Sequence, residues 1–311
     1  MNNKIAGLHH ITAIAGNAKR NYDFYTGVLG LRMVKKTVNF DDPGTYHFYF
    51  GNETGAPGTI LTFFPWEGIG TGRIGTGMAS EIGYAVPIGS LGFWAERFQQ
   101  LGVQHETNIE RFGEKLLSFT DPDGLKINLI EPLQDDQRKP WQAAGVTEKE
   151  GLKGFHSIVL TLNDIKATAE ILTDVFEYRL QAQEGNRYRF ITDAVENASI
   201  VDLEEAPELG RGVNAAGTNH HVAFRVANED ILMNYRAKIA ARGLSITPKI
   251  DRDYFFSLYF REPGGVLFEL ATDNPGFATD ETAEALGSSL RLPKQYEPSR
   301  AKIEAVLPKL D

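Results

Sequence analysis

LHHITAIAG (residues 8–16) has three counterparts further along the chain: SEIGYAV (80–86), FHSIVLTL (155–162) and NHHVAFRV (219–226). Each is rich in apolar and β-branched residues, which is typical of a strand. Each is followed by apolar residues at helical spacing and then by further strand-like runs. A strand, a helix and several strands therefore recur, which predicts four copies of one structural unit.

The expected helices carry recognisable start and stop residues. Ser, Asn and Asp are typical first caps, and Gly is typical just beyond a helix end. We expect caps at Asn17, at Ser90 and at Asn163 or Asp164, and stops at Gly30, Gly102 and Gly243.

Three of the four units close with a strand that follows a Pro-Gly type turn: APGTILTFF (56–64), DPDGLKINLIE (121–131) and EPGGVLFELA (262–271). The third unit closes with TDAVENASIVDL (192–203), which lacks that turn. The units are expected at about 5–67, 79–133, 153–205 and 217–273. They predict a first pair within 1–133, a linker at 134–152, a second pair within 153–273, and a C-terminal segment at 274–311.

The composition excludes several classes of site. None of the 311 residues is cysteine, so disulfides, thiolate nucleophiles, iron–sulfur clusters and cysteine-bound zinc are ruled out. A net charge of -9 argues against nucleic acid as a partner. The first residues lack the apolar core of a secretion signal, and no apolar run reaches membrane-spanning length, so we expect a cytoplasmic protein without a membrane partner. The oligomeric state is left open, a homo-oligomer included.

The four repeated units resemble the modules of the vicinal-oxygen-chelate superfamily, which includes glyoxalases, bleomycin-resistance proteins and extradiol dioxygenases. The resemblance implies an α+β fold of four βαβββ modules that form two open, barrel-like domains. In that family, two modules pair their curved sheets around a metal cavity.

Two His-His pairs lie in the opening strands of the first and fourth units. Adjacent side chains on a strand point to opposite faces, so only one histidine of each pair can face a cavity. Val222, Phe224 and Val226 form the heavily apolar face of the fourth opening strand, which leaves His221 on the other face. By the same alternation, His10 shares a face with Thr12. The predicted metal ligands are therefore His10 and His221.

Glu269 stands inside the apolar run GGVLFELA of the fourth closing strand. A carboxylate buried there is costly unless it is paired or bound to a cation. Two imidazoles and one carboxylate leave adjacent metal positions open, an arrangement suited to non-haem Fe(II) with a substrate and O2. The sequence thus predicts a metal site of His10, His221 and Glu269.

Two alternative interpretations stay open at this point. Each histidine could be structural, and Glu269 could pair with Arg225, Arg252 or Arg261. The middle units could also hold a rival metal site, but they offer one imidazole, so a vestigial cavity is the favoured interpretation there. The candidate residues of this second site are Glu81, Asn128, Glu131, His156 and Asp202.

Within the superfamily, the chain is similar nearly end to end to the hydroquinone-type ring-cleaving dioxygenases. Matching stretches lie at 8–16, 35–66, 154–160, 184–190, 218–226, 251–277 and 286–297. The resemblance implies the same three metal ligands, His10, His221 and Glu269. It further implies catalytic roles around the metal for His9, Thr12, His220, Arg252 and Tyr259.

Since all three ligands lie in the first and fourth modules, those two must pair around the metal, leaving modules two and three to pair with each other. The resemblance implies an enzyme that uses Fe(II), with Mn(II) as the alternative, to open a small hydroquinone- or catechol-type diol with O2. One rival is a glyoxalase-type isomerase or hydrolase, which would need a second carboxylate where Thr62 stands. The other rival is a non-catalytic protein that binds a drug or a quinone.

Overall fold

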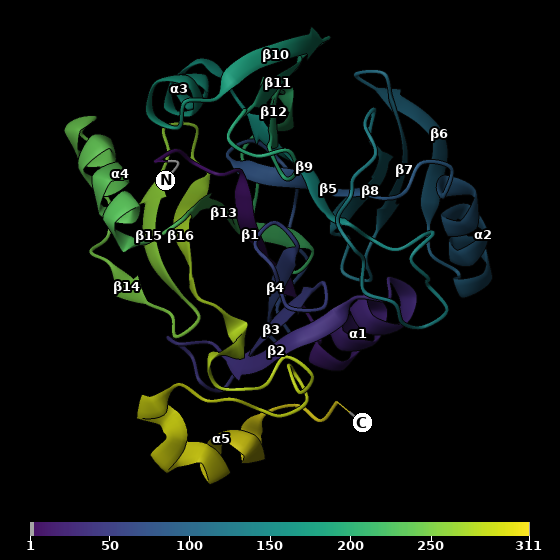
Figure 1. The fold of residues 1–311 in the computed structure, drawn as a ribbon, viewed down its shortest axis with the longest axis vertical. Coiled ribbons are helices and arrows are strands. Elements are labelled where there is room, and N and C mark those ends of the chain that lie inside the picture. Colours follow the sequence, from purple (N-terminus) through teal and green to yellow (C-terminus); the bar gives the residue numbers. More distant parts are fainter. Residues whose placement is uncertain (1–2, 311) are drawn as a thin grey trace.

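The computed structural model describes residues 3–310 and contains two curved sheets of eight strands each (Figure 1). The first module consists of β1 (Leu8–Ala15), α1 (Ala18–Asp23), the π-helical turn η1 (Phe24–Val28), β2 (Arg32–Val38), β3 (Tyr46–Gly51) and β4 (Ile60–Pro65). The fourth consists of β13 (Thr218–Val226), α4 (Glu229–Ala241), β14 (Ile250–Asp251), β15 (Phe255–Arg261) and β16 (Leu267–Pro275). Together these two modules form one sheet in the order β14-β15-β16-β13-β1-β4-β3-β2.

The second sheet is built in the same way from the two middle modules. The second module consists of β5 (Met78–Ala85), α2 (Leu91–Leu101), β6 (His105–Arg111), β7 (Glu114–Thr120) and β8 (Lys126–Glu131). The third consists of β9 (Gly154–Leu162), α3 (Lys166–Glu170), the π-helical turn η2 (Ile171–Val175), β10 (Arg179–Glu184), β11 (Arg187–Ile191) and β12 (Ile200–Glu205), followed by the 3-10 turn η3 (Pro207–Leu209). Their order is β10-β11-β12-β9-β5-β8-β7-β6.

The predicted α+β fold and the predicted pairing of modules are both confirmed. The antiparallel contact of β1 with β13 joins the first module to the last, and β5 with β9 joins the middle two. The division of the chain at 133 and 153 stays a prediction about the order of modules along the sequence, since each sheet takes strands from both halves.

The helix caps follow the expected chemistry with two corrections, of which the first is that Ser90 precedes α2 without a side-chain capping hydrogen bond. The Asn17 side chain accepts a hydrogen bond from the N–H of Arg20, and Gly102 ends α2 in the left-handed conformation. The third helix starts one residue later than expected, with Ile165 as its first cap. Asp164 still accepts a hydrogen bond from the Lys166 N–H, so its side chain satisfies a free helix donor from just outside the helix.

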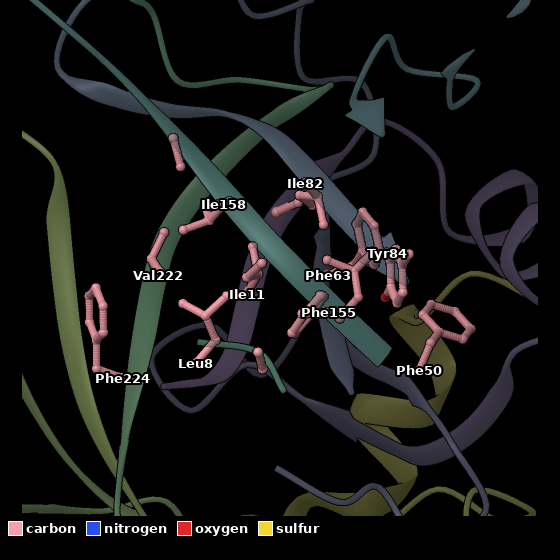
Figure 2. Close-up of a cluster of buried hydrophobic side chains, with 14 of the residues drawn as sticks. Leu8, Ile11, Phe50, Phe63, Ile82, Tyr84, Phe155, Ile158, Val222 and Phe224 are labelled. Carbon is pink, nitrogen blue, oxygen red and sulfur yellow. The ribbon is translucent and has the colours of Figure 1, made fainter. Parts of the chain in front are cut away.

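The main core lies between the two sheets. Ile11, Ile82, Ile158 and Val222, one from each opening strand, face one another there and are fully buried (Figure 2). Burying such an aliphatic side chain contributes roughly 1.5–3 kcal/mol. The opening strands thus alternate between this core and the concave face of their own sheet, which leaves the concave face available for polar side chains.

The C-terminal segment packs on the outside of the first sheet, where Figure 1 shows α5 below β2. It contains the 3-10 turns η4 (Phe277–Thr279) and η5 (Lys294–Ser299) and the helix α5 (Arg300–Val306). Lys35 on β2 is fully buried and bridges to Asp280 and Glu281 of this segment, at 2.5 Å in each case. In residues 3–310, no helix combines the length and apolar character needed to cross a membrane.

Candidate metal centre

Three side chains converge on the concave face of the first sheet: His10 from β1, His221 from β13 and Glu269 from β16. All three are buried, and their ligand atoms lie within 4.8 Å of one another. Glu269 Oε2 is 3.1 Å from His10 Nε2 and 2.9 Å from His221 Nε2. Among the residues that the structure describes, this is the one group of three that could hold a metal ion.

The donor set fits a divalent cation. Although Oε2 of Glu269 is buried beside two ring nitrogens, it has no hydrogen bond of acceptable geometry. Burial alone raises the pKa of Glu269, but the neighbouring His10 and His221 outweigh it and hold that pKa well below its usual value. Burial lowers the pKa of His221, although the nearby Glu269 acts in the opposite direction. The lowered pKa favours the neutral ring, which is the form that binds metals.

The tautomer of His10 follows from its neighbour His9. Nε2 of His9 lies 3.1 Å from the carbonyl oxygen of Thr272, which can only accept, so that nitrogen carries the proton. Burial, with His10 beside it, lowers the pKa of His9 far below its usual value, so its Nδ1 is an unprotonated acceptor. Nδ1 of His10, 2.9 Å away, must therefore donate. The Nε2 lone pair of His10 is then directed at the metal position.

His220 holds His221 in the same way, with 2.8 Å between their Nδ1 atoms. Burial and the adjacent His221 lower the pKa of His220 to about 3, so this ring is neutral as well. Unlike His9, His220 lines the cavity beside the triad, and its Nε2 has no hydrogen-bond partner among residues 3–310. Metal binding through Nε2 of His221 would leave the His221 proton on Nδ1, donated to Nδ1 of His220, and the neutral His220 ring would then carry its own proton on Nε2, facing the cavity.

The cavity in front of the triad has a volume of about 330 Å³. Its walls are largely aromatic and include Phe40, Tyr49, Phe64, Trp66, Phe255 and Tyr259. Flat apolar walls with a few convergent polar groups suit a small aromatic ligand.

Arg252 and Tyr259 lie together at one side of this cavity. The Arg252 guanidinium is 5.3 Å from the centre of the Tyr259 ring and 5.5 Å from that of Phe40. The Tyr259 ring lies 5.6 Å from the His221 ring. Burial raises the pKa of Tyr259 well above its usual value, with a further contribution from Glu269, so its hydroxyl keeps its proton at neutral pH.

None of the arginines considered from the sequence forms an ion pair with Glu269. Arg225 bridges to Asp273, Arg261 bonds to the carbonyl of Gly265, and Arg252 lies 3.9 Å from Asp41. Ser257 on β15 instead donates its hydroxyl to Oε1 of Glu269. Ser257 was not predicted, since a lone serine in a strand carries no sequence signal of its own.

The hydroxyl of Thr12 is hydrogen-bonded to that of Thr62 at 2.8 Å. Thr62 in turn contacts Nε2 of His47 at 2.9 Å, and Nδ1 of His47 contacts the Tyr49 hydroxyl at 2.9 Å. His47 and Tyr49 line the cavity and were missed from the sequence. The alternating polar residues of TYHFYFG could have suggested a lined face, but not which cavity they line.

The strand registers relate the two halves of the site. Thr12 lies opposite Thr62, and Tyr49 also lies opposite Thr62. Ala223 lies opposite Glu269, and Tyr259 also lies opposite Glu269. His10 precedes Thr12 by two positions, and His221 precedes Ala223 by two positions. The equivalent pairs are therefore His10 and His221, Thr62 and Glu269, Tyr49 and Tyr259, and His47 and Ser257.

The same registers place Glu81, Ser157 and Asp202 of the second sheet where the first has His10, His221 and Glu269. There the carboxylates are neutralised by cationic side chains. Asp202 pairs with Arg189 at 2.9 Å, and Glu81 pairs with Arg187 at 2.8 Å. The remaining candidates are bound elsewhere: His156 to Glu114, Asn128 to Glu81, and Glu131 to the N–H groups of Gly89 and Leu91.

Residues 7–129 and 154–270 each match the family model described as the glyoxalase/bleomycin resistance protein/dioxygenase superfamily. The Bacillus subtilis protein MhqO, named as a candidate ring-cleaving dioxygenase, is 46% identical over 98% of this chain and 96% of its own. The chlorohydroquinone/hydroquinone 1,2-dioxygenase of Sphingobium indicum is 38% identical over 94% of this chain and 93% of its own. A crystal structure of a candidate dioxygenase from Bacillus subtilis superposes with a TM-score of 0.95 at 45% identity, covering 99% of this chain and 98% of that one.

Proposed function

The chain belongs to the glyoxalase/bleomycin resistance/dioxygenase superfamily, and we propose that it is an Fe(II)-dependent enzyme that opens a hydroquinone- or catechol-type ring with O2. The observation that carries this proposal is the buried convergence of His10, His221 and Glu269 beside an aromatic cavity. Full-length similarity to ring-cleaving dioxygenases supports it independently.

Fe(II) bound by these three residues would stabilise the anion of one diol oxygen and offer neighbouring positions to the diol and to O2. Mn(II) prefers similar ligands and is the alternative metal. Ser257 orients the carboxylate of Glu269 by donating to Oε1, while His9 fixes the tautomer of His10.

The remaining residues act on the diol itself. Phe64, Tyr259 and Phe255 provide walls that hold a flat ring and exclude water. Arg252 places a cation beside the ring, where it favours the anionic form of the diol. His220 holds a proton at Nε2 facing the cavity, and Tyr259 holds one at its hydroxyl, so each can donate to an oxygen that gains charge. Thr12 acts indirectly, through its bond to Thr62.

A glyoxalase-type reaction is disfavoured by one residue. The register makes Thr62 the counterpart of Glu269, so the position of a second carboxylate ligand holds a hydroxyl. A protein that only binds a drug or quinone would have no need of a buried metal-ligand set, and its metal content would separate it from an enzyme.

The experiment is a single-turnover reaction started by oxygen. The protein is loaded with Fe(II) under anaerobic conditions, mixed with hydroquinone or catechol, and exposed to O2. Oxygen uptake and the ring-opened acid are then followed together. We expect one O2 consumed for each ring opened. Bound iron without oxygen uptake from either diol would contradict the proposed function.

A further inference from the structure

The cavity contains a second tyrosine whose place mirrors that of Tyr259. Tyr49 lies opposite Thr62 on β3 just as Tyr259 lies opposite Glu269 on β15. Both tyrosines line the cavity. Their surroundings differ: Arg252 lies over the Tyr259 ring, whereas the Tyr49 hydroxyl is hydrogen-bonded to the neutral side chain of His47.

We propose that Tyr49, oriented by His47, recognises the hydroxyl of the diol that does not bind the metal, and so selects diols whose second hydroxyl lies away from the first. The inference rests on the proposed function and adds a specificity-determining residue to it. Tyr49 touches the substrate in this scheme, and His47 is a positioning residue.

The orientation of the Tyr49 hydroxyl follows from a continuous chain of bonds. His47 is held at both ring nitrogens, by the Tyr49 hydroxyl at Nδ1 and by Thr62 at Nε2. Thr62 is held in turn by Thr12 on the neighbouring strand. Burial lowers the pKa of His47 well below its usual value, with His10 and His221 adding to the effect, so the ring is neutral and has one donor and one acceptor nitrogen.

This chain leaves the Tyr49 hydroxyl with one unused hydrogen-bonding role. If it donates to His47, its oxygen can still accept from a ligand. If it accepts from His47, its own proton can still be donated. A diol hydroxyl both donates and accepts, so it matches either arrangement, whereas an apolar ring substituent matches neither.

The position of Tyr49 also bears on the class of diol. Tyr49 lines the same cavity as His10, His221 and Tyr259. An ortho-diol can direct both oxygens to one metal ion and then has no hydroxyl left for Tyr49. A para-diol always has one. The Tyr49 contact therefore favours hydroquinones over catechols.

The test compares hydroquinone with phenol, which lacks the second hydroxyl. Dissociation constants are measured without oxygen on iron-loaded wild type and on Tyr49→Phe, which removes only the hydroxyl. We expect the variant to bind hydroquinone roughly 3- to 10-fold more weakly, the effect of one neutral hydrogen bond, and to bind phenol as the wild type does. His47→Gln, which removes the partner at Nδ1, should shift binding in the same direction.

Tyr254→Phe is the matched control. Tyr254 is another buried tyrosine, with its ring 6.3 Å from that of Tyr49, but its hydroxyl donates to Asp280 outside the cavity. Its loss should leave both dissociation constants unchanged. An equal weakening of hydroquinone and phenol in Tyr49→Phe, or no change in either, would overturn the inference while leaving the proposed function intact. Failure of the iron-loaded wild type to bind hydroquinone while it still binds and opens catechol would overturn the inference alone, and failure with both diols would overturn the proposed function as well.

Discussion

Nδ1 of His9 lies 2.9 Å from Nδ1 of His10, and the far nitrogen of His9 faces the carbonyl of Thr272 at 3.1 Å. A backbone carbonyl thus sets the proton position on His9, and His9 sets it on His10. Removing His9 frees His10 to rotate and to adopt either tautomer. We therefore expect His9→Ala to weaken Fe(II) binding roughly 10- to 100-fold, as is typical when a partner of a metal ligand is lost.

Equilibrium dialysis against graded Fe(II) measures that effect. His156→Asn is the control, because His156 is also a buried histidine in an opening strand but pairs with Glu114 in the second sheet. Iron affinity equal to wild type in His9→Ala would contradict the assigned role of His9.

The hydroxyl of Ser257 is a second support for the metal centre, since it donates to Oε1 of Glu269. Without it, the buried carboxylate loses its one hydroxyl donor and can turn away from the two imidazoles. Ser257→Ala should bind Fe(II) roughly 10-fold more weakly while unfolding at nearly the same temperature. Ser80→Ala, which removes a buried hydroxyl bonded to Thr161 in the second sheet, should leave iron affinity unchanged. Equal affinities in the two variants would show that Ser257 does not position Glu269.

The free energy of unfolding should depend on pH through Glu114 of the second sheet. Burial raises the pKa of this carboxyl, but His156 and Arg189 outweigh it and hold the pKa at about 2, below the ordinary value of 4.5. Because the folded pKa is depressed, its contribution is complete above pH 4.5 and is lost as pH falls towards 2. Glu114→Gln should cost about 3 kcal/mol at neutral pH, in line with breaking a buried ion pair.

Urea unfolding of both proteins from pH 7 down to pH 3 measures this dependence. The gap between the unfolding free energies of wild type and Glu114→Gln should narrow as the pH falls. A gap that stays constant with pH would contradict the assigned ion pairs.

The C-terminal segment should depend on the buried amine of Lys35, which bridges to Asp280 and Glu281 at 2.5 Å in each case. Lys35→Met keeps the length of the side chain but leaves the buried Glu281 with only the more distant cation of Arg291, 3.5 Å away. We expect a loss of about 3–5 kcal/mol of unfolding free energy and faster proteolytic removal of residues after 274. Unchanged proteolysis would show that other contacts hold the segment.

Strand alternation was sufficient to predict that His10, His221 and Glu269 lie together. Val222 and Phe224 pack in the core, so His221 had to face the other way. Because the ligands lie in the first and last modules, the pairing of those modules also followed from the sequence. Both inferences depend on local pattern and on one physical constraint, the cost of burying Glu269 alone.

The rest of the site depends on register, which local pattern does not encode. Tyr49 reaches the cavity, and Ser257 reaches Glu269, only because β3 and β15 pair with β4 and β16 at particular residues. The same holds for the second sheet, where Arg189 lies opposite Asp202 and neutralises the charge of that carboxylate. A sequence pattern identifies the strands, but it cannot say which arginine meets which carboxylate.

The most direct measurement is Fe(II) content and oxygen uptake with hydroquinone in wild type and in His221→Ala, with His156→Asn as the control. Loss of one of three ligands should reduce bound iron from one ion per chain to a small fraction and abolish oxygen uptake. The control should retain both. A His221→Ala variant that keeps full iron and full oxygen uptake would contradict the assignment of the metal centre.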